Sequence, residues 1–301
     1  MGTIIEASAT ATAHPRPFAP GARKLADAAA RLCLERADRT VDELDLLINA
    51  GVYHDKLLQE PALASLIQED IGANPDPDRP LGAGHGTFSF DISNGACGLL
   101  TGIHLVDGML ASGTVELGIV VASDIDPEPG VSEGFGFPSV GGAVLLSADD
   151  SRAGFTAFQF ATFPEYAELF GSYVDWHQDA RRGLTHHGRN ILTVEIAESY
   201  AAQALECAES TARELAGAQA LDLGQVDLVV ANASVPGFAD ALARRLGVSA
   251  ERVASPADGL ATAHTAAPAV ALESVQLAAS RTVLFVSAGA GITVAAALYR
   301  A

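Results

Sequence analysis

The 301-residue chain has little cysteine and no long apolar run, and both absences exclude whole classes of protein. Its three cysteines, Cys33, Cys97 and Cys207, are widely separated, so neither a disulfide framework nor the paired spacing of a zinc site is indicated. No apolar stretch reaches the roughly 18 residues that a membrane-spanning helix requires. The first residues lack the basic segment and apolar core of a secretory signal, so we expect a cytoplasmic location and reduced thiols.

Positive charge is also scarce, since 18 lysines and arginines face 37 aspartates and glutamates and leave a net charge of −19. A surface this acidic repels the phosphates of nucleic acids and of anionic membranes, and we expect neither partner. An acidic carrier protein could dock only where basic residues gather locally. In the second half of the chain the main basic residues are Arg181, Arg182, Arg189, Arg244, Arg245 and Arg252.

The hydrophobic content of 49% is enough for a large core, and its pattern alternates between strands and helices. The stretch DLLINAGV at 45–52 returns as DLVVANASV at 227–235, each between two helical patterns. Buried strands rich in valine, isoleucine and leucine predict an α/β fold whose sheets are covered by helices. The repetition predicts two related halves.

Cys97 stands where a strand pattern, FSFDIS, gives way to a helical pattern that continues to about Ala111. A thiol at a helix N-terminus lies at the positive end of the helix dipole, which predicts a lowered pKa and a nucleophilic thiolate. The alternative is that Cys97 is a small buried apolar side chain, the usual place of a free cysteine. Cys33 and Cys207 lie inside amphipathic helical patterns, where we prefer this structural interpretation.

The second half repeats the arrangement around the cysteine. Aligning the strand GIVVASD with TVLFVSAG gives an offset of 165 residues, which makes Thr262 the counterpart of Cys97 and places His264 just after it. If the halves pack about a pseudo-twofold axis, the two helix N-termini meet near that axis. A thiol and an imidazole are then expected to face each other.

Four stretches carry a resemblance to a known family. They are DISNGACGLLTGIHLVDGMLASG, VELGIVVASDIDP, FGFPSVGGAVLLSADD and the terminal VSAGAGITVAAALYR. Together, in order and over nearly the whole chain, they resemble ketoacyl-acyl-carrier-protein synthase III and its relatives in the thiolase superfamily. The resemblance implies an α/β fold of the thiolase-like five-layer αβαβα type with two pseudo-symmetric halves, here residues 1–155 and 156–301, and a homodimer.

In that family a cysteine takes an acyl group from a coenzyme A or acyl-carrier-protein thioester, so the resemblance implies this role for Cys97. It also implies an oxyanion hole made by the backbone N–H groups of Cys97 and of Ala290, in the glycine-rich stretch that begins at Gly289. No cofactor and no metal are implied, and SAGAGI does not follow the dinucleotide-binding fingerprint. The resemblance points to lipid biosynthesis or secondary metabolism.

Two positions depart from the family pattern. Condensing members place a histidine and an asparagine opposite the cysteine, and the corresponding positions here are Asn232 and Thr262. An asparagine amide can donate a hydrogen bond to an oxyanion but cannot act as a base. His264 could instead deprotonate Cys97 or an attacking alcohol or amine, or it could simply bond a backbone carbonyl. An acidic residue usually orients such a histidine, and the sequence offers only Asp258 as a neighbour.

The other histidines are weaker candidates. His54 follows a strand end and is a possible pocket residue, whereas His104 lies two turns along the cysteine-bearing helix and should not reach the sulfur. His186 and His187 could line an entrance, although exposed loop histidines are more common. They fall in the aromatic-rich segment 157–190, which we interpret as an irregular insertion.

Three functions are consistent with these residues. The leading one is a thiolase-fold acyltransferase that forms an acyl-Cys97 intermediate from a carrier-protein or coenzyme A thioester and passes the acyl group to an oxygen or nitrogen nucleophile. The second is a decarboxylative Claisen ketosynthase, with His264 and Asn232 in changed roles. The third is a non-catalytic partner subunit of a synthase. The stretch AHPRPFAP is too short for the family's adenine-binding cap, which favours a carrier-bound or short pantetheine donor.

Overall fold

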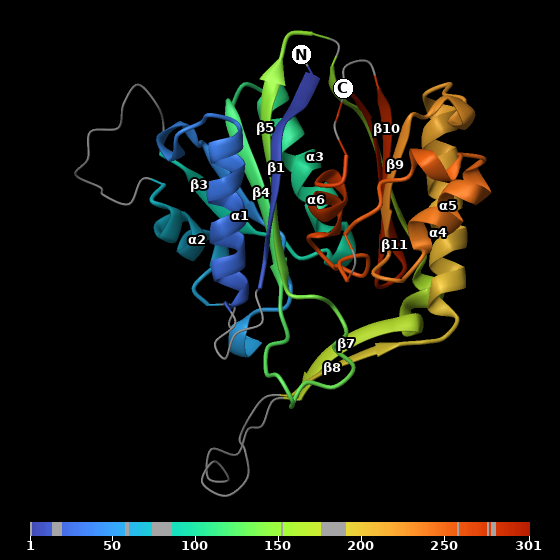
Figure 1. Ribbon diagram of the computed structural model, residues 1–301, viewed down its shortest axis with the longest axis horizontal. Coiled ribbons are helices and arrows are strands. Elements are labelled where there is room, and N and C mark those ends of the chain that lie inside the picture. The colour runs from blue at the N-terminus through green and yellow to red at the C-terminus, as the bar shows by residue number, and fades with distance from the viewer. Residues whose placement is uncertain are drawn as a thin grey trace, which may run out of the picture.

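The computed structural model describes residues 2–13, 20–57, 60–73, 86–151, 153–175, 191–257, 259–275, 277 and 281–301. Within these ranges the chain forms alternating layers of helix and sheet (Figure 1). The outer layers are α1 (Ala22–Arg36) with α2 (Leu63–Ile71), and α4 (Tyr200–Ala218) with α5 (Phe238–Leu246). The central layer holds α3 (Gly98–Ala111) and α6 (Ala267–Leu272). The predicted five-layer fold is confirmed. Of the helices in these ranges, none is long and apolar enough to cross a membrane.

The strands follow the hydrogen-bonded order β3-β2-β4-β5-β1-β6-β11-β10-β9, with β1 and β6 joined at the pair Thr3 and Phe155. The first-half strands are β1 (Gly2–Thr12), β2 (Leu46–Asn49), β3 (Phe88–Asp91), β4 (Leu117–Asp124) and β5 (Val140–Asp149). The second-half strands are β6 (Gly154–Thr162), β9 (Leu228–Asn232), β10 (Thr282–Gly289) and β11 (Thr293–Arg300). A separate hairpin pairs β7 (Phe170–Asp175) with β8 (Ile191–Ile196).

The two halves repeat one topology. Outward from the junction, the first half runs β1, β5, β4, β2 and β3, and the second runs β6, β11, β10 and β9. A parallel bridge between Val229 and Val253 takes the place of the outermost strand in the second half. Strands β4 and β10 begin, and also end, 165 residues apart, in agreement with the sequence alignment. The pseudo-symmetric halves are confirmed, while the division after residue 155 stays a prediction.

Small residues allow the central layer to pack closely. All eight positions of β4 are buried, and their valine, isoleucine and alanine side chains suit a strand covered on both faces. On the neighbouring strand, a Cβ added to Gly142 would lie 2.7 Å from the Ala269 Cβ on α6. The loop that precedes α6 is therefore held firmly against the first half.

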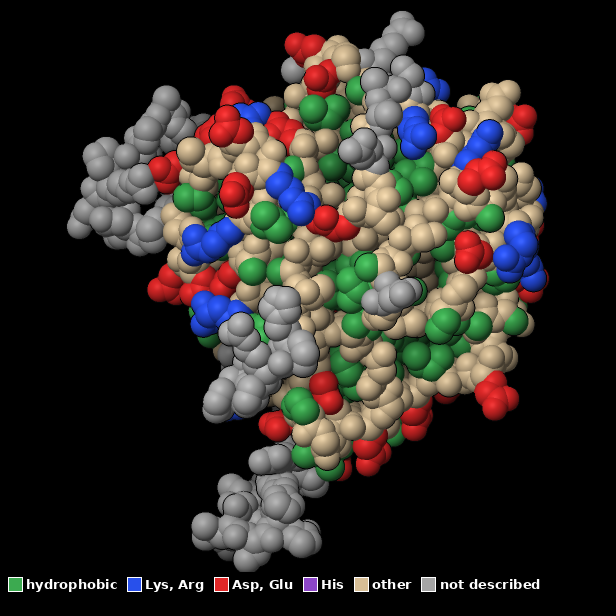
Figure 2. Space-filling model, viewed as in Figure 1, with side chains coloured by type: hydrophobic (Ala, Val, Ile, Leu, Met, Phe, Trp, Pro, Cys, Tyr) green, Lys and Arg blue, Asp and Glu red, His purple; other side chains and the backbone are tan. Residues whose placement is uncertain are grey.

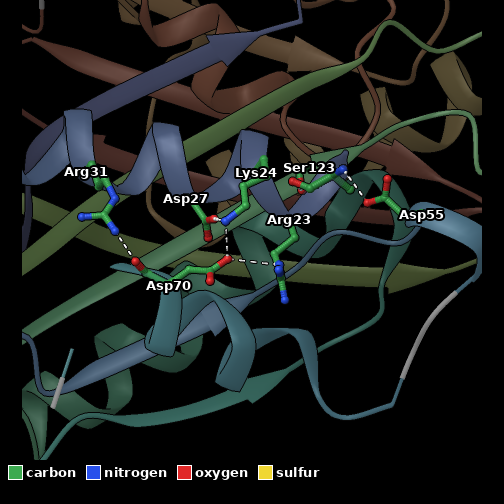
Figure 3. A network of polar contacts seen from close by, with 8 residues as sticks. Arg23, Lys24, Asp27, Arg31, Asp55, Asp70 and Ser123 are labelled. Atoms are coloured by element: carbon green, nitrogen blue, oxygen red, sulfur yellow. Dashed lines mark hydrogen bonds and ion pairs between the residues drawn. The ribbon is translucent and has the colours of Figure 1, made fainter. Parts of the chain in front are cut away.

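A polar network joins the outer helices of the first half (Figure 3). On α2, the Asp70 carboxylate accepts a hydrogen bond from Lys24 at 2.8 Å and pairs with Arg23 at 3.1 Å. Lys24 also donates to Asp27 at 3.1 Å. Asp55 accepts the first N–H of α1 at 2.9 Å, which ties the helix start to the segment after β2.

The segment 157–190 differs from the sequence expectation. It begins inside β6, which pairs with β11 along its whole length, and so its first part is not an irregular insertion. Phe155 and Phe158 of β6 pack in one core cluster and Ala157 packs against another, so the strand contacts the core on both faces. The part at 176–190, with His186, His187, Arg181, Arg182 and Arg189, lies outside the described residues.

Candidate active site

Cys97 ends a short 3-10 turn, Gly95–Cys97, and is the N-cap of α3. The positive φ of Gly95, 48°, lets the chain turn sharply into the helix. The cysteine side chain is fully buried, and its Sγ donates to the backbone carbonyls of Ser287 at 3.2 Å and Thr293 at 3.3 Å. The cysteine of the first half is therefore held against the β10–β11 hairpin of the second half.

Burial raises the pKa of the Cys97 thiol to about 12. The prediction of a lowered pKa is wrong, because removal from water outweighs the field at the helix start. The two backbone carbonyls also accept from the neutral S–H group. At neutral pH the protein carries Cys97 as a thiol, and its use as a nucleophile requires a base nearby.

His264 lies in the loop that leads into α6. Its ring is buried, 3% exposed, and packs on Phe137 at a centroid distance of 4.7 Å and on Tyr53 at 5.2 Å. Its Nε2 faces the cysteine turn, since a Cβ added to Gly95 would lie 3.6 Å from that atom. The structure thus brings the imidazole beside the turn that ends in Cys97, while the Cys97 sulfur bonds to carbonyls and not to the ring.

Sequence reasoning missed a carboxylate that stands behind the imidazole. Asp124 ends β4, and its Oδ2 lies 3.4 Å from His264 Nδ1, close enough for charge interaction although Nδ1 makes no hydrogen bond within the described residues. Oδ1 accepts the N–H groups of Val52 at 3.0 Å and Tyr53 at 2.9 Å. Oδ2 accepts the N–H of Thr265 at 2.9 Å and also its hydroxyl.

The environment keeps Asp124 ionised. Burial by itself raises the pKa of this carboxyl group, but the nearby His264 charge and the donors from Thr265 and Tyr53 together hold the pKa well below its ordinary value. The sequence did contain a signal for this residue, because Asp124 ends the strand VELGIVVASD at the edge where ligand crevices of α/β sheets lie. Asp258, the acidic neighbour in sequence, lies outside the described residues.

Asn232 ends β9 and pairs in register with Ser287 of β10. Its Oδ1 accepts a hydrogen bond from the Ser287 hydroxyl at 2.7 Å, and its Nδ2 is buried with no hydrogen-bond partner in the part of the chain described. Because the Ser287 carbonyl accepts from the Cys97 thiol, Ser287 links Asn232 to the sulfur. An amide with an unused N–H donor can bind a carbonyl oxygen.

The glycine-rich hairpin lies against the cysteine turn. A Cβ added to Gly289 would lie 3.4 Å from the backbone N of Ala96 and 3.9 Å from that of Cys97. Ala290 follows as an exposed residue of the tight turn, and its carbonyl accepts the N–H of Thr293 at 3.1 Å. The C-terminal backbone thus approaches the N–H groups at the start of α3.

The remaining candidates lie around this centre. Thr262 is half-buried and belongs to the same loop as His264. His54 is buried, its ring lies against Gly51, and burial lowers its pKa. His104 is exposed on α3 and packs on Phe158 at 4.5 Å. Across the described ranges, no group of three or more histidine, cysteine or carboxylate side chains is placed to hold a metal ion.

Comparisons with known proteins agree with this architecture. No protein-family model matches the chain. A β-ketoacyl-[acyl-carrier-protein] synthase III from Acidiphilium cryptum is 26% identical over 284 residues, which cover 90% of this chain and 82% of that protein. The crystal structure of 3-oxoacyl-[acyl-carrier-protein] synthase III from Aquifex aeolicus superposes with a TM-score of 0.79 at 19% identity and covers 100% of both chains.

A crystal structure of Xanthomonas campestris OleA has a TM-score of 0.77 at 13% identity and covers 100% of this chain and 99% of that one. The solved structures match the five-layer architecture, and the sequence relative aligns over 90% of this chain. The chain is thus similar in sequence to a protein named β-ketoacyl-[acyl-carrier-protein] synthase III, and it shares the fold of the solved synthase III and OleA structures.

Proposed function

We propose that the chain is an acyltransferase that forms a thioester on Cys97 and passes the acyl group to an oxygen or nitrogen nucleophile. The proposal rests on one observation. A buried, neutral thiol sits at a turn from one half, and an imidazole backed by an ionised carboxylate faces that turn from the other half. The similarity to a protein named β-ketoacyl-[acyl-carrier-protein] synthase III supports a carrier-protein thioester as the donor.

In the first step the Cys97 thiol gives its proton to His264 Nε2, and the sulfur attacks the thioester carbonyl carbon. The Asn232 amide and the Ala290 N–H donate to the oxyanion. The Cys97 N–H joins them when it leaves the Asn94 carbonyl, to which it donates at 3.0 Å. The carbon–sulfur bond of the donor then breaks, and the departing thiolate takes the proton from His264. The products are the acyl-enzyme and a free donor thiol.

In the second step His264 accepts a proton from the hydroxyl or amine of the acceptor. The acceptor's oxygen or nitrogen attacks the acyl carbon, the bond to the Cys97 sulfur breaks, and the sulfur recovers a proton from His264. Asp124 stabilises the imidazolium in both steps, because its charge lies 3.4 Å from Nδ1.

Two alternatives remain open to experiment. A decarboxylative ketosynthase would release carbon dioxide from a malonyl thioester, with His264 and the Asn232 amide polarising its carbonyl. The unused Nδ2 donor of Asn232 supports this role as well. A non-catalytic partner subunit would form no adduct at all. Carbon dioxide release therefore separates the first two functions, and adduct formation separates both from the third.

We propose that the donor is carrier-bound or a short pantetheine thioester. The segment 14–19, where an adenine-binding cap would begin, lies outside the described residues. On the face seen in Figure 2, basic side chains are scattered among acidic ones. Arg245 pairs with Glu209 at 3.1 Å, whereas Arg244 is exposed beside it and could meet an acidic carrier. Faster loading from acyl-coenzyme A than from acyl-pantetheine would contradict this proposal.

We also propose that the chain forms a homodimer through the edge of the first sheet. β3 is the outermost strand there, and Phe88 on it is 58% exposed. An open edge strand with an exposed aromatic ring favours pairing with another strand. Light scattering should give the mass of two chains for the parent protein and of one chain for Phe88→Asp, and a parent mass of one chain would contradict the proposal.

Intact-protein mass spectrometry tests the proposed function. Incubation with an acyl-pantetheine thioester should add one acyl mass to the parent protein, and the adduct should disappear with neutral hydroxylamine, as a thioester does. Cys97→Ala should show no adduct. Cys207→Ala is the matched control, because that cysteine is also buried but lies in α4, and it should load at the parent rate. An adduct that persists in Cys97→Ala would refute the assignment.

A further inference from the structure

Three donor groups face a single carboxylate oxygen. Asp124 Oδ2 accepts the Thr265 N–H at 2.9 Å and the Thr265 hydroxyl, and it also lies 3.4 Å from His264 Nδ1. The Thr265 side chain is fully buried, so its hydroxyl is shielded from bulk water. The histidine nitrogen is buried and makes no hydrogen bond within the described residues. The hydroxyl of Thr265 thus occupies the oxygen that the imidazole needs.

We propose that Thr265 is a positioning residue that limits the hydrogen bond between Asp124 and His264 by competing for the same carboxylate oxygen. An O–H donor withdraws electron density from the carboxylate and fills a lone-pair direction. The imidazolium form of His264 therefore receives less stabilisation than an unshared carboxylate would provide.

Among the described residues, the other titratable groups near the ring carry no charge near neutral pH. Tyr53 comes from the segment after β2, and Cys97 from the turn before α3. Burial raises the pKa of each of these side chains to about 12. His54, beyond Asp124, is also kept neutral, because burial lowers its pKa. Phe137 and Phe170 complete the apolar surroundings of the ring. Asp124 is therefore the charged group to which the ring responds.

Titration of the His264 ring by NMR tests the inference on the full chain. Its imidazole resonances can be assigned by their loss in His264→Gln. Thr265→Val keeps the side-chain shape and removes the hydroxyl, so the pH midpoint of ring protonation should rise by roughly 0.5 to 1 unit. Thr265→Ser keeps the hydroxyl and should return the midpoint to the parent value. An unchanged or lowered midpoint in Thr265→Val would overturn the proposal.

Two further variants serve as an alternative and as a control. Thr265→Ala removes the same hydroxyl with less steric demand, and it gives the same rise even if Thr265→Val fails to fold. Thr211→Val is the matched control, because Thr211 is also a buried threonine but bonds the Cys207 carbonyl in α4. Its variant should leave the midpoint unchanged.

The kinetic consequence rests on the proposed function. The acidic limb of the acylation rate should move to higher pH in Thr265→Val, by the same amount as the ring midpoint. If no adduct forms on Cys97 but the midpoint still rises, the proposed function fails and the inference on Thr265 stands. If Cys97 is acylated but the midpoint stays constant, the inference on Thr265 fails and the proposed function stands.

Discussion

The starts of α3 and α6 are equivalent places in two copies of one topology, but they differ in shape and chemistry. The first is a tight turn that leads into a 14-residue helix, and the second is an open loop before a 6-residue helix. Each helix start is contacted by the end of a strand from the other half. Asp124, at the end of β4, bonds Thr265 before α6, and Gly289, at the end of β10, lies against Ala96 before α3.

These crossed contacts explain how two halves of one topology can form an asymmetric proposed site. A carboxylate at one strand end can orient a ring in the opposite loop, whereas a glycine at the other strand end lets backbone approach backbone. Neither half contains all the side chains of the proposed site. The site exists only when the two halves pack, and the variants below test each side of that arrangement.

Replacing Asp124 should have the largest effect on stability. Asp124→Asn keeps the shape but removes the charge and turns an N–H group towards other donors, so we expect a loss of about 3 kcal/mol or more in unfolding free energy. Denaturation by urea measures this loss. Asp91→Asn is the control, because Asp91 caps α2 from an exposed site and should cost about 1 kcal/mol. Equal losses would argue against a special role for Asp124.

Filling the space opposite α6 should have the next largest effect. Gly142→Ala would place a Cβ 2.7 Å from Ala269 and 3.2 Å from Ala266, so the helix must shift at a cost of about 2 kcal/mol. Gly108→Ala on α3 is the matched change, because no described atom outside its own stretch of helix lies within 4 Å of the added Cβ, and it should stabilise the helix slightly. Thermal unfolding of the two variants should move in opposite directions.

The outer layers of the two halves also differ in their charged groups, and this difference makes stability depend on pH. An ion pair between Glu209 and Arg245 joins α4 to α5, whereas α1 buries Asp27 with one oxygen lacking a partner among the described residues. Burial, followed by a hydrogen bond with Asp70, raises the pKa of Asp27 to about 6. A carboxyl group whose pKa is raised on folding stabilises the fold below its unfolded value of 3.8, and this contribution is lost as the pH rises through about 6.

Asp27→Asn removes this titration. Relative to the parent, the variant should gain about 1 to 2 kcal/mol of unfolding free energy between pH 4 and pH 8. Urea denaturation at both pH values measures the change. A stability difference that does not vary with pH would show that Asp27 titrates normally.

The smallest effect is expected from the ring that packs on the imidazole. Phe137→Leu keeps an apolar side chain but removes a ring stacked on His264 at 18° between the ring planes, which should slow acyl transfer roughly two- to tenfold. Single-turnover kinetics of the acylated protein measure the rate. Phe155→Leu, in the separate aromatic cluster with Tyr299, should leave the rate unchanged. Equal slowing in both variants would indicate a general loss of packing.

The duplicated fold could be predicted from the sequence because its signals are local or repeated. The strands β4 and β10 each contain a continuous run of apolar residues, and the turn at Cys97 joins a strand pattern to a helical one. β6 was missed because its aromatic residues obscured a strand alternation.

The site was less predictable because its decisive contacts join distant segments. The bond from Thr265 to Asp124 spans 141 positions, and the bond from Cys97 to Ser287 spans 190. A helix-start argument that considers only neighbouring residues predicts an activated thiolate. The burial produced by the opposite half reverses that prediction.

In the proposed mechanism, an imidazole from one half activates a thiol from the other. The most direct test is the rate at which an acyl-pantetheine thioester loads Cys97 in His264→Gln, followed by rapid-quench mass spectrometry at neutral pH. Because the thiol is neutral without a base, loading should slow by roughly 100-fold or more relative to the parent. Loading at the parent rate would contradict the account.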